Sequence, residues 1–377
     1  MIAKTVQLIP PGPHADVDVT AGRLAVRNRR LAGGRRDGVT LVELVAGDTT
    51  AVVLPDRGLG IWRVRAGGTD LGWQSPVAGP VHPRFVPLGE TSGIGWLDGF
   101  DELVARCGLV SNGAPDFDAS GRLRHGLHGR IANLPAHELS VTLDETAGTV
   151  TITGAVDETR FLVHSLRMTT SLTLRADRPG IAWTDTVTNL SGRPTTMQML
   201  YHVNLGPPLL GAGAEVVAAV AELAPRDAAA VADVPTWNRY DAPRAGRGEE
   251  VHFARLVPDA SGRATALLVA PGGGRAAALS WQAATLPCFT LWKNQGSLAD
   301  GYVTGLEPAT NQPNPRSFEE SQGRVVSLAS GASITFDLAI DLLEGDALAT
   351  ERTRLAALVP AGGPRIHATP RPGWSPA

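Results

Sequence analysis

The sequence predicts an all-β protein, folded as one large antiparallel β-sandwich. Apolar and polar residues alternate along many segments, which is typical of strands that bury one face. The 43 glycines and 28 prolines recur along the whole chain of 377 residues, as expected when turns join many short strands. Hydrophobic residues make up 43% of the chain and charged residues 19%, a composition that can bury a large core and excludes disorder over most of the length.

The clearest strand is predicted at 333–342, where an apolar residue occupies every second position from Ile334 to Leu342. One face of this strand is therefore expected to be buried. Similar patterns predict consecutive antiparallel strands at 149–153, 162–174, 181–188, 194–205, 264–270, 276–281 and 287–292.

Helix signals are confined to two segments. The alanine-rich stretch 214–223 favours a helix by propensity, and 345–358 has the stronger pattern, with Ala, Leu, Glu and Arg at helical spacing. Beyond Val359 the chain is rich in proline and glycine, which predicts an extended surface tail. No linker divides the chain, so we expect one sandwich domain over 1–359, with about 1–50 as an added layer, and a tail over 360–377.

The charge balance and the cysteine count exclude several classes of protein. The chain has 34 Lys and Arg against 37 Asp and Glu, a net charge of −3 with His neutral, so no nucleic-acid partner bound through bulk positive charge is expected. Cys107 and Cys288 form no CxxC pair, which argues against a disulfide framework or a structural zinc cluster. The N-terminus lacks an export-signal pattern, and no apolar run approaches the roughly 20 residues of a membrane span. We expect a cytoplasmic protein with no membrane partner.

The predicted strand at 194–205 has two faces of different character. Its apolar face contains Met197, Met199, Tyr201, Val203 and Leu205, and its other face contains Thr196, Gln198, Leu200, His202 and Asn204. A mostly polar face on so apolar a strand indicates a wet cleft, in which a histidine can exchange protons near neutral pH. The pattern is equally that of a strand with an ordinary solvated face.

A second histidine, His128, lies in LHGRIANLPA, two residues before Arg130. On a strand the two side chains would share one face and could bind oxygen atoms together. The glycines at 126 and 129 permit close backbone approach, and a turn that needs glycine explains them as well.

Glu307 lies in GLEPATNQP, at the end of a predicted strand and before a polar, proline-rich loop. Pro308 biases Glu307 toward extended backbone geometry. A carboxylate held there could act as a general base, although a surface glutamate before a turn has the same pattern.

Together these segments resemble the aldose 1-epimerase (galactose mutarotase-like) superfamily. Its members have an early His-Gly motif, a later catalytic histidine on a strand ending in Asn-Leu, and a Leu-Glu-Pro-like segment near the C-terminus, in the order found here. The resemblance covers roughly residues 50–345 and is closest to an uncharacterised bacterial branch. Its motifs are LPDRG at 54–58, LGW at 71–73, GWL at 95–97, CGL at 107–109, LHGRIANLPA at 127–136 and GLEPATNQP at 305–313.

The resemblance implies a supersandwich fold with the active site in a cleft across one sheet. It implies that Glu307 removes the anomeric hydroxyl proton, that His202 protonates the ring oxygen, and that His128 assists at the ring oxygen or a neighbouring hydroxyl. This isomerase chemistry on a small-molecule sugar needs only proton transfer. No metal or other cofactor is therefore expected.

The chain also departs from the family pattern. Many relatives have an arginine four residues after the His-Gly histidine, where this chain has Ala132, so we assign the substrate-binding role to Arg130. The aspartate that many mutarotases direct at substrate hydroxyls has no secure match, although Glu249 and Glu250 occupy the expected stretch. Further candidates for substrate binding, chosen for residue type and position, are Arg106, Asn112, Trp292 and Lys293, whereas Trp96 and Phe100 are assigned to packing.

Two other functions remain open from the sequence. One is a metal-dependent isomerase or epimerase of a keto or modified sugar, with ligands drawn from His128, His202, His252 and Glu307, although no short ligand spacing supports it. The other is a carbohydrate-binding protein without catalysis. Retention of His and Glu at all three motif positions argues against that alternative, because binding alone needs neither.

Overall fold

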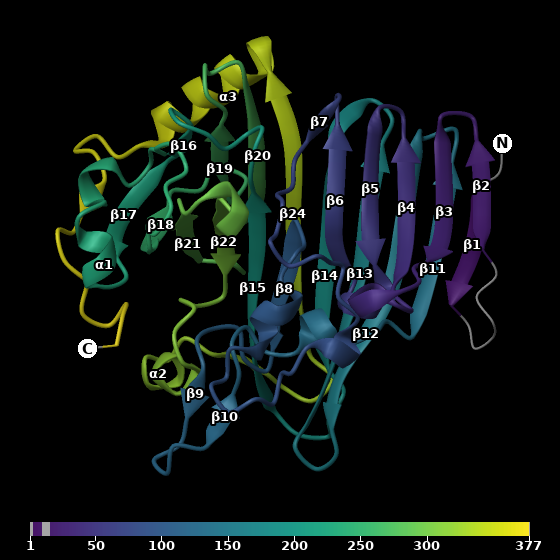
Figure 1. Ribbon diagram of the computed structural model, residues 1–377, viewed down its shortest axis with the longest axis horizontal. Coiled ribbons are helices and arrows are strands. Elements are labelled where there is room, and N and C mark those ends of the chain that lie inside the picture. The colour runs from purple at the N-terminus through teal and green to yellow at the C-terminus, as the bar shows by residue number, and fades with distance from the viewer. Residues whose placement is uncertain (1–2, 10–15, 377) are drawn as a thin grey trace.

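The computed structural model describes residues 3–9 and 16–376. Two large sheets pack face to face (Figure 1), and within the described residues one has nine strands and the other fourteen. Adjacent strands pair antiparallel except β17 and β25, which run parallel. The predicted all-β antiparallel sandwich is therefore confirmed.

The nine-stranded sheet contains, in spatial order, β1 (Lys4–Ile9), β11 (Glu138–Asp144), β12 (Thr149–Arg160), β13 (His164–Arg175), β14 (Arg178–Asn189), β24 (Ser333–Glu344), β20 (Arg275–Gln282), β19 (Arg263–Val269) and β16 (Glu215–Ala218).

The fourteen-stranded sheet contains, in spatial order, β2 (Val17–Ala21), β3 (Leu24–Arg30), β4 (Thr40–Ala46), β5 (Thr49–Leu54), β6 (Gly60–Ala66), β8 (Val104–Leu109), β15 (Thr195–Leu205), β22 (Val303–Ala309), β21 (Cys288–Asn294), β18 (Glu249–Leu256), β17 (Val220–Pro225) and β25 (Arg365–Ile366), with β7 (Thr69–Asp70) on β6 and β23 (Val326–Leu328) on β15.

The remaining elements are short or lie at the edges. A separate hairpin pairs β9 (Asp116–Phe117) with β10 (Leu123–His125). The α-helices are α1 (Ala228–Val231), α2 (Arg316–Ser321) and α3 (Gly345–Leu358), and 3-10 turns occur at 34–36, 55–57, 83–85, 95–99, 131–133, 234–236 and 298–300. No helix in the described part of the chain has the length and apolar character needed to cross a membrane.

The main core lies between the two sheets, where strands β12 to β14 contact β3 to β6. Side chains of one face of each strand fill this layer, as the alternation predicts. On β15 the core-facing residues are the predicted ones, since Met197, Met199, Tyr201, Val203 and Leu205 all belong to this cluster. The opposite face of β15 therefore points away from the sandwich core, where Leu200 packs in a separate cluster with Trp73, Trp96 and Phe100.

One of the two helix predictions is correct. The helix at 345–358 is α3, which packs Leu348 and Leu355 against β19 and β20. The helix expected at 214–223 is wrong, because β16 and β17 occupy that stretch. Alanine propensity is outweighed there by sheet pairing of β16 with β19 and of β17 with β18.

The two ends of the chain are more integrated than the sequence suggested. In the described part of this region, β1 extends the nine-stranded sheet and β2 to β5 extend the other. The tail does not simply lie extended on the surface, because Trp374 is buried against Val251 and Phe253 of β18. Burial of this large aromatic ring stabilises the packing of the tail against β18.

We predict that Trp374→Ala lowers the free energy of unfolding by about 3 kcal/mol, because it removes a buried indole. The ring also lies under the Arg371 guanidinium, 4.6 Å from its carbon. Chemical denaturation measures the loss. Phe161→Ala is the control, because Phe161 is 86% exposed and its truncation should change stability by less than about 0.5 kcal/mol. Equal stability of both variants and the wild type would show that the tail does not contribute.

Candidate functional site

Three adjacent strands bring the candidate residues together on the outer face of the large sheet. Val203 of β15 pairs with Leu306 of β22, so His202 and Glu307 form the next pair along the ladder. Glu307 in turn pairs with Thr290 of β21. Paired residues point to the same face of a sheet, and the pairing therefore places the His202 imidazole beside the Glu307 carboxyl group.

The two groups are close and almost completely buried. His202 Nε2 lies 3.3 Å from Glu307 Oε1, and the residues are 5% and 2% exposed. The separation is that of an ion pair, but the angles are not those of a hydrogen bond, since Oε1 has no hydrogen-bond partner. The carboxyl group is thus free to bond to a ligand.

A glycine makes room for this pair. A Cβ atom on Gly305 would lie 2.5 Å from Glu307 Oε1 and 3.1 Å from His202 Cε1. The first distance is below van der Waals contact, so any side chain here would displace the carboxyl group. This is one reason why glycine is required two residues before Glu307.

Asn204 fixes the tautomer of His202. The Asn204 amide nitrogen donates to the backbone oxygens of Glu102 and His202, which leaves the amide oxygen facing His202 Nδ1 at 2.6 Å. The protonated Nδ1 therefore donates to Asn204, and Nε2 presents its lone pair to Glu307 when the ring is neutral. The sequence showed Asn204 on the same strand face but did not assign it this role.

His128 approaches His202 from a turn, not from a strand. Its backbone has φ of +56°, and its Nδ1 donates to the Asn112 carbonyl oxygen at 2.9 Å. The His128 and His202 rings are 5.3 Å apart and perpendicular. His128 is thus brought to the pair, as the sequence led us to expect.

The expectation that His128 and Arg130 share a strand face is wrong. The segment is irregular, with a 3-10 turn at Ile131–Asn133, because glycine lies on both sides of the Leu127–His128 pair and Gly129 has φ of +70°. Arg130 is exposed and lines a cavity that neither His202 nor Glu307 lines.

Aromatic side chains enclose the two histidines. Phe100 and Trp292 have ring centroids 4.9 and 5.3 Å from that of His202, and Trp96 lies 4.6 Å from His128. Trp96 and Phe100 were expected only to pack. They do pack, with exposures of 1% and 7%, but what they pack against is the candidate site.

This apolar enclosure sets the protonation of the site. Burial raises the pKa of Glu307 well above its ordinary value and lowers that of His202 well below it, and the neighbouring His128 lowers the pKa of His202 further. Burial also lowers the pKa of His128 to about 4. Burial disfavours every charged form, so it favours a protonated Glu307 beside a neutral imidazole over the ion pair.

Further polar groups of the same face have no partner within the protein. Both amide atoms of Gln198 and the hydroxyl of Thr290 are buried without a hydrogen bond. Buried polar atoms are nearly always paired. Thr290 pairs with Glu307, so its unpaired hydroxyl beside the carboxyl group is the mark of a surface built for a polar ligand. The sequence alone did not assign a ligand-binding role to Gln198 or Thr290.

Trp292 lies at the edge of the site, where Glu249 holds it. The indole nitrogen donates to Glu249 Oε2 at 2.8 Å, and Arg226 binds the other carboxylate oxygen at 2.8 Å. Glu249 comes from the stretch in which the sequence suggested a counterpart of the family's aspartate. In this structure it contacts Trp292 and not the histidines.

Two predicted substrate-binding residues lie on the core side of the sheet. Arg106 is fully buried between the sheets and donates to Asp185 and to the Leu59 carbonyl. Lys293 is also fully buried, with Nζ 2.6 Å from Asp233. Successive residues of a strand point to opposite faces of the sheet. Arg106 and Lys293 each neighbour a residue of the site face, so their own side chains point away from His202.

Asn112 is near the site, but its side chain makes hydrogen bonds within the protein. Its side-chain amide exchanges two hydrogen bonds of 3.0 Å with that of Asn311. Its contribution to the site is the backbone oxygen that orients His128.

The metal-ligand set considered from the sequence does not assemble. His252 bonds to Asp233 on the core side of β18, because it pairs with the core-facing Leu291. Among the described residues, no three His, Cys, Asp or Glu side chains are grouped so that they could hold a metal ion.

Solved structures resemble this chain over nearly its whole length. A crystal structure of a "putative aldose 1-epimerase" from Klebsiella pneumoniae subsp. pneumoniae is 30% identical with a TM-score of 0.92, covering 98% of this chain and 99% of that one. A galactose mutarotase-like protein from Clostridium acetobutylicum is 15% identical with a TM-score of 0.59, covering 86% and 100%. Galactose 1-epimerase from Lactobacillus acidophilus is 12% identical with a TM-score of 0.54, covering 85% and 99%. The last two likenesses establish the fold alone.

No curated protein matches the chain. A family model described as "Domain of unknown function (DUF4432)" matches residues 36–342. Since this match spans most of the chain, and the Klebsiella structure shares its fold at 30% identity, the chain belongs to the DUF4432 family, within the aldose 1-epimerase (galactose mutarotase-like) superfamily.

Proposed function

We propose that the protein is an aldose 1-epimerase-like isomerase, which interconverts the anomers of a monosaccharide or a sugar derivative. The observation that carries the proposal is the buried pairing of His202 with Glu307 across β15 and β22, 3.3 Å apart. The likeness to the Klebsiella structure adds support for this class of reaction.

The reaction needs one proton removed and one delivered. In the proposed mechanism the Glu307 carboxylate takes the proton of the anomeric hydroxyl, and the His202 imidazolium gives its Nε2 proton to the ring oxygen as the bond between C1 and that oxygen breaks. Rotation about C1–C2 and reclosure, with both transfers reversed, give the other anomer. His128 assists at the ring oxygen or a neighbouring hydroxyl.

The protonation of the ligand-free site is compatible with this scheme. Neutral His202 with protonated Glu307 contains the same number of protons as imidazolium with carboxylate, so one proton shift converts the resting pair into the working pair. Hydrogen bonds from sugar hydroxyls to Glu307 Oε1, which has no partner in the protein, would favour the carboxylate. Trp292 and Phe100 offer apolar surfaces against which a sugar ring can pack.

We predict that Glu307→Gln lowers the rate of anomer exchange by about 10²- to 10⁴-fold, because the amide keeps the shape but cannot accept the proton. Polarimetry or NMR exchange spectroscopy over a panel of aldoses, uronates and keto sugars measures the rate. The control is Glu43→Gln, on β4 in the part of the sheet remote from β22, which should keep the wild-type rate. Wild-type exchange in Glu307→Gln would exclude Glu307 as the base.

His202 is tested by two substitutions of different size. His202→Asn and His202→Phe should both lower the exchange rate at least about 100-fold, because neither side chain can transfer the proton. From strand alternation alone, His202→Asn should cost no stability. The burial of His202 changes that expectation to a loss of about 1–2 kcal/mol in chemical denaturation. An active His202→Phe protein would mean that the ring serves only to pack.

The pH dependence of kcat/KM follows from the two pKa shifts. The productive pair holds one proton, and a second binds only well below 6.5, the ordinary histidine value, because burial lowers the pKa of His202. The last proton leaves Glu307 only well above 4.5, because its pKa is raised. We expect a plateau whose acid limb lies below pH 6.5. An acid limb centred above that value would contradict the assigned pair.

A further inference from the structure

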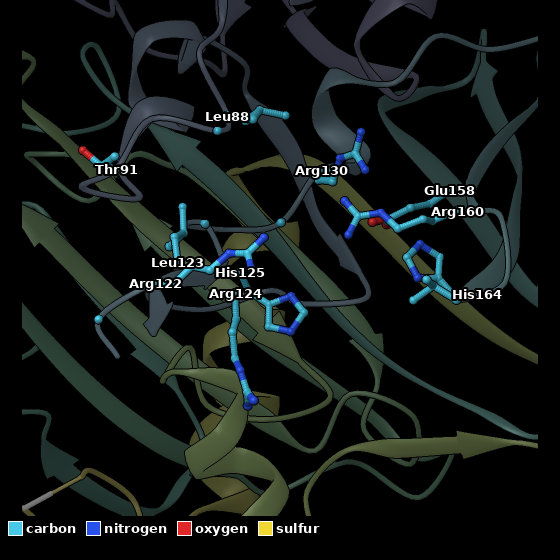
Figure 2. A pocket seen from close by; sticks show the side chains of 15 residues that line it. Leu88, Thr91, Arg122, Leu123, Arg124, His125, Arg130, Glu158, Arg160 and His164 are labelled. Carbon is cyan, nitrogen blue, oxygen red and sulfur yellow. The ribbon is translucent and has the colours of Figure 1, made fainter. Parts of the chain in front are cut away.

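A cavity of about 660 Å³ lies beside the turn that carries His128. Gly126 and Gly129 line it, and these residues flank the Leu127–His128 pair, while His128 itself packs on Trp96 and His202. The cavity therefore borders the backbone that carries His128. Its walls come from three segments (Figure 2), at 88–91, 121–130 and 158–164.

The walls carry a concentration of positive charge. Arg122, Arg124, Arg130 and Arg160 all line the cavity and are exposed. No hydrogen bond or ion pair engages any of these four guanidinium groups within the described residues. The chain as a whole has a net charge of −3, so this cluster is not a consequence of a basic composition.

Three of the arginines line the cavity from two segments of the chain. Arg130 and Arg160 both interact electrostatically with Glu158, and in the view of Figure 2 the Arg122 side chain extends toward them. Arg124 extends away from them in that view and interacts electrostatically with Asp118. Planar guanidinium groups that make no hydrogen bond within the protein are suited to bind the oxygens of an anion in pairs.

The other titratable groups of the cavity offset only part of this positive charge. Burial lowers the pKa of His125 and of His164, so both are neutral near pH 7, and His164 Nε2 is buried without a partner. Glu158 is the acidic side chain in the wall. It is 3% exposed and accepts a hydrogen bond of 2.6 Å from the Leu109 backbone N–H, and burial raises its pKa to about 7.

We propose that this cavity binds a dianionic group of the phosphate class through Arg122, Arg130 and Arg160. A neutral sugar would need a balance of donors and acceptors, whereas these walls present mainly donors. The group has two sources, a free phosphate-bearing molecule or a phosphate ester on the sugar itself. The proposal does not depend on anomer exchange, because binding is measured directly.

Isothermal titration calorimetry with inorganic phosphate, and then with pyrophosphate, tests the site on the full chain. Arg122→Gln combined with Arg160→Gln should weaken binding at least about tenfold, because two charge-assisted contacts are lost. The matched control is Arg29→Gln, an exposed arginine on β3, which should leave the affinity unchanged. Both positions in the double variant are exposed, so folding should be retained.

A second substitution, expected to strengthen phosphate binding, distinguishes an effect of charge from a loss of folded structure. Glu158→Gln removes the negative charge in the wall and keeps an oxygen for the Leu109 N–H, so phosphate should bind more tightly, most clearly above pH 7. Damage to the fold would not tighten binding. Equal phosphate affinity in the wild type, the double arginine variant and Glu158→Gln would overturn the proposal.

Competition distinguishes the two sources of the anion. If the phosphate belongs to the sugar, glucose 6-phosphate binds more tightly than inorganic phosphate, and glucose competes with it. If the anion is a separate molecule, the two phosphates bind equally and glucose has no effect. Either result supports the anion site when the double arginine variant abolishes it. If Glu307→Gln loses anomer exchange but binds phosphate as the wild type does, the two proposals stand separately.

Discussion

The antiparallel pairing of β15 with β22 is the constraint on which the candidate site depends. It sets His202 opposite Glu307, and a slip of one residue would turn one of the two side chains into the sandwich core. Gly305 makes the close approach possible, since a Cβ atom there would collide with the carboxyl group. The register of these two strands, and not the conformation of a loop, thus positions His202 and Glu307.

Burial then gives the paired groups their chemistry. The aromatic rings of Trp96, Phe100 and Trp292 exclude water, and the pKa values of His202 and Glu307 move in opposite directions as a result. Asn204 fixes which imidazole nitrogen faces the carboxyl group. The aromatic enclosure, the opposite pKa shifts and the Asn204 hydrogen bond together favour a neutral pair. Transfer of one proton from Glu307 to His202 would make this pair charged.

The strands that flank β15 and β22, which are β8 and β21, have a structural role on their core-facing side. Arg106 with Asp185, and Lys293 with Asp233, are fully or almost fully buried ion pairs. Each pair is supported by further hydrogen bonds, as a buried charge requires. Neighbouring polar residues on one strand therefore have different roles, because alternate positions face a ligand site and the protein core.

The sequence by itself determined the all-β class, the positions of strands such as β12, β15 and β24, and α3 at 345–358. The family resemblance of its motifs brought His128, His202 and Glu307 together as candidates. Those inferences rest on local alternation and on ordered motifs, which a chain displays without folding. Only the tertiary structure showed that 214–223 forms paired strands and that Arg106 and Lys293 face the core instead of the site. It also showed that Arg122, Arg130 and Arg160 line one cavity. Each of these depends on which strand or turn, distant in sequence, packs alongside. A local pattern of apolar and polar residues does not specify that neighbour.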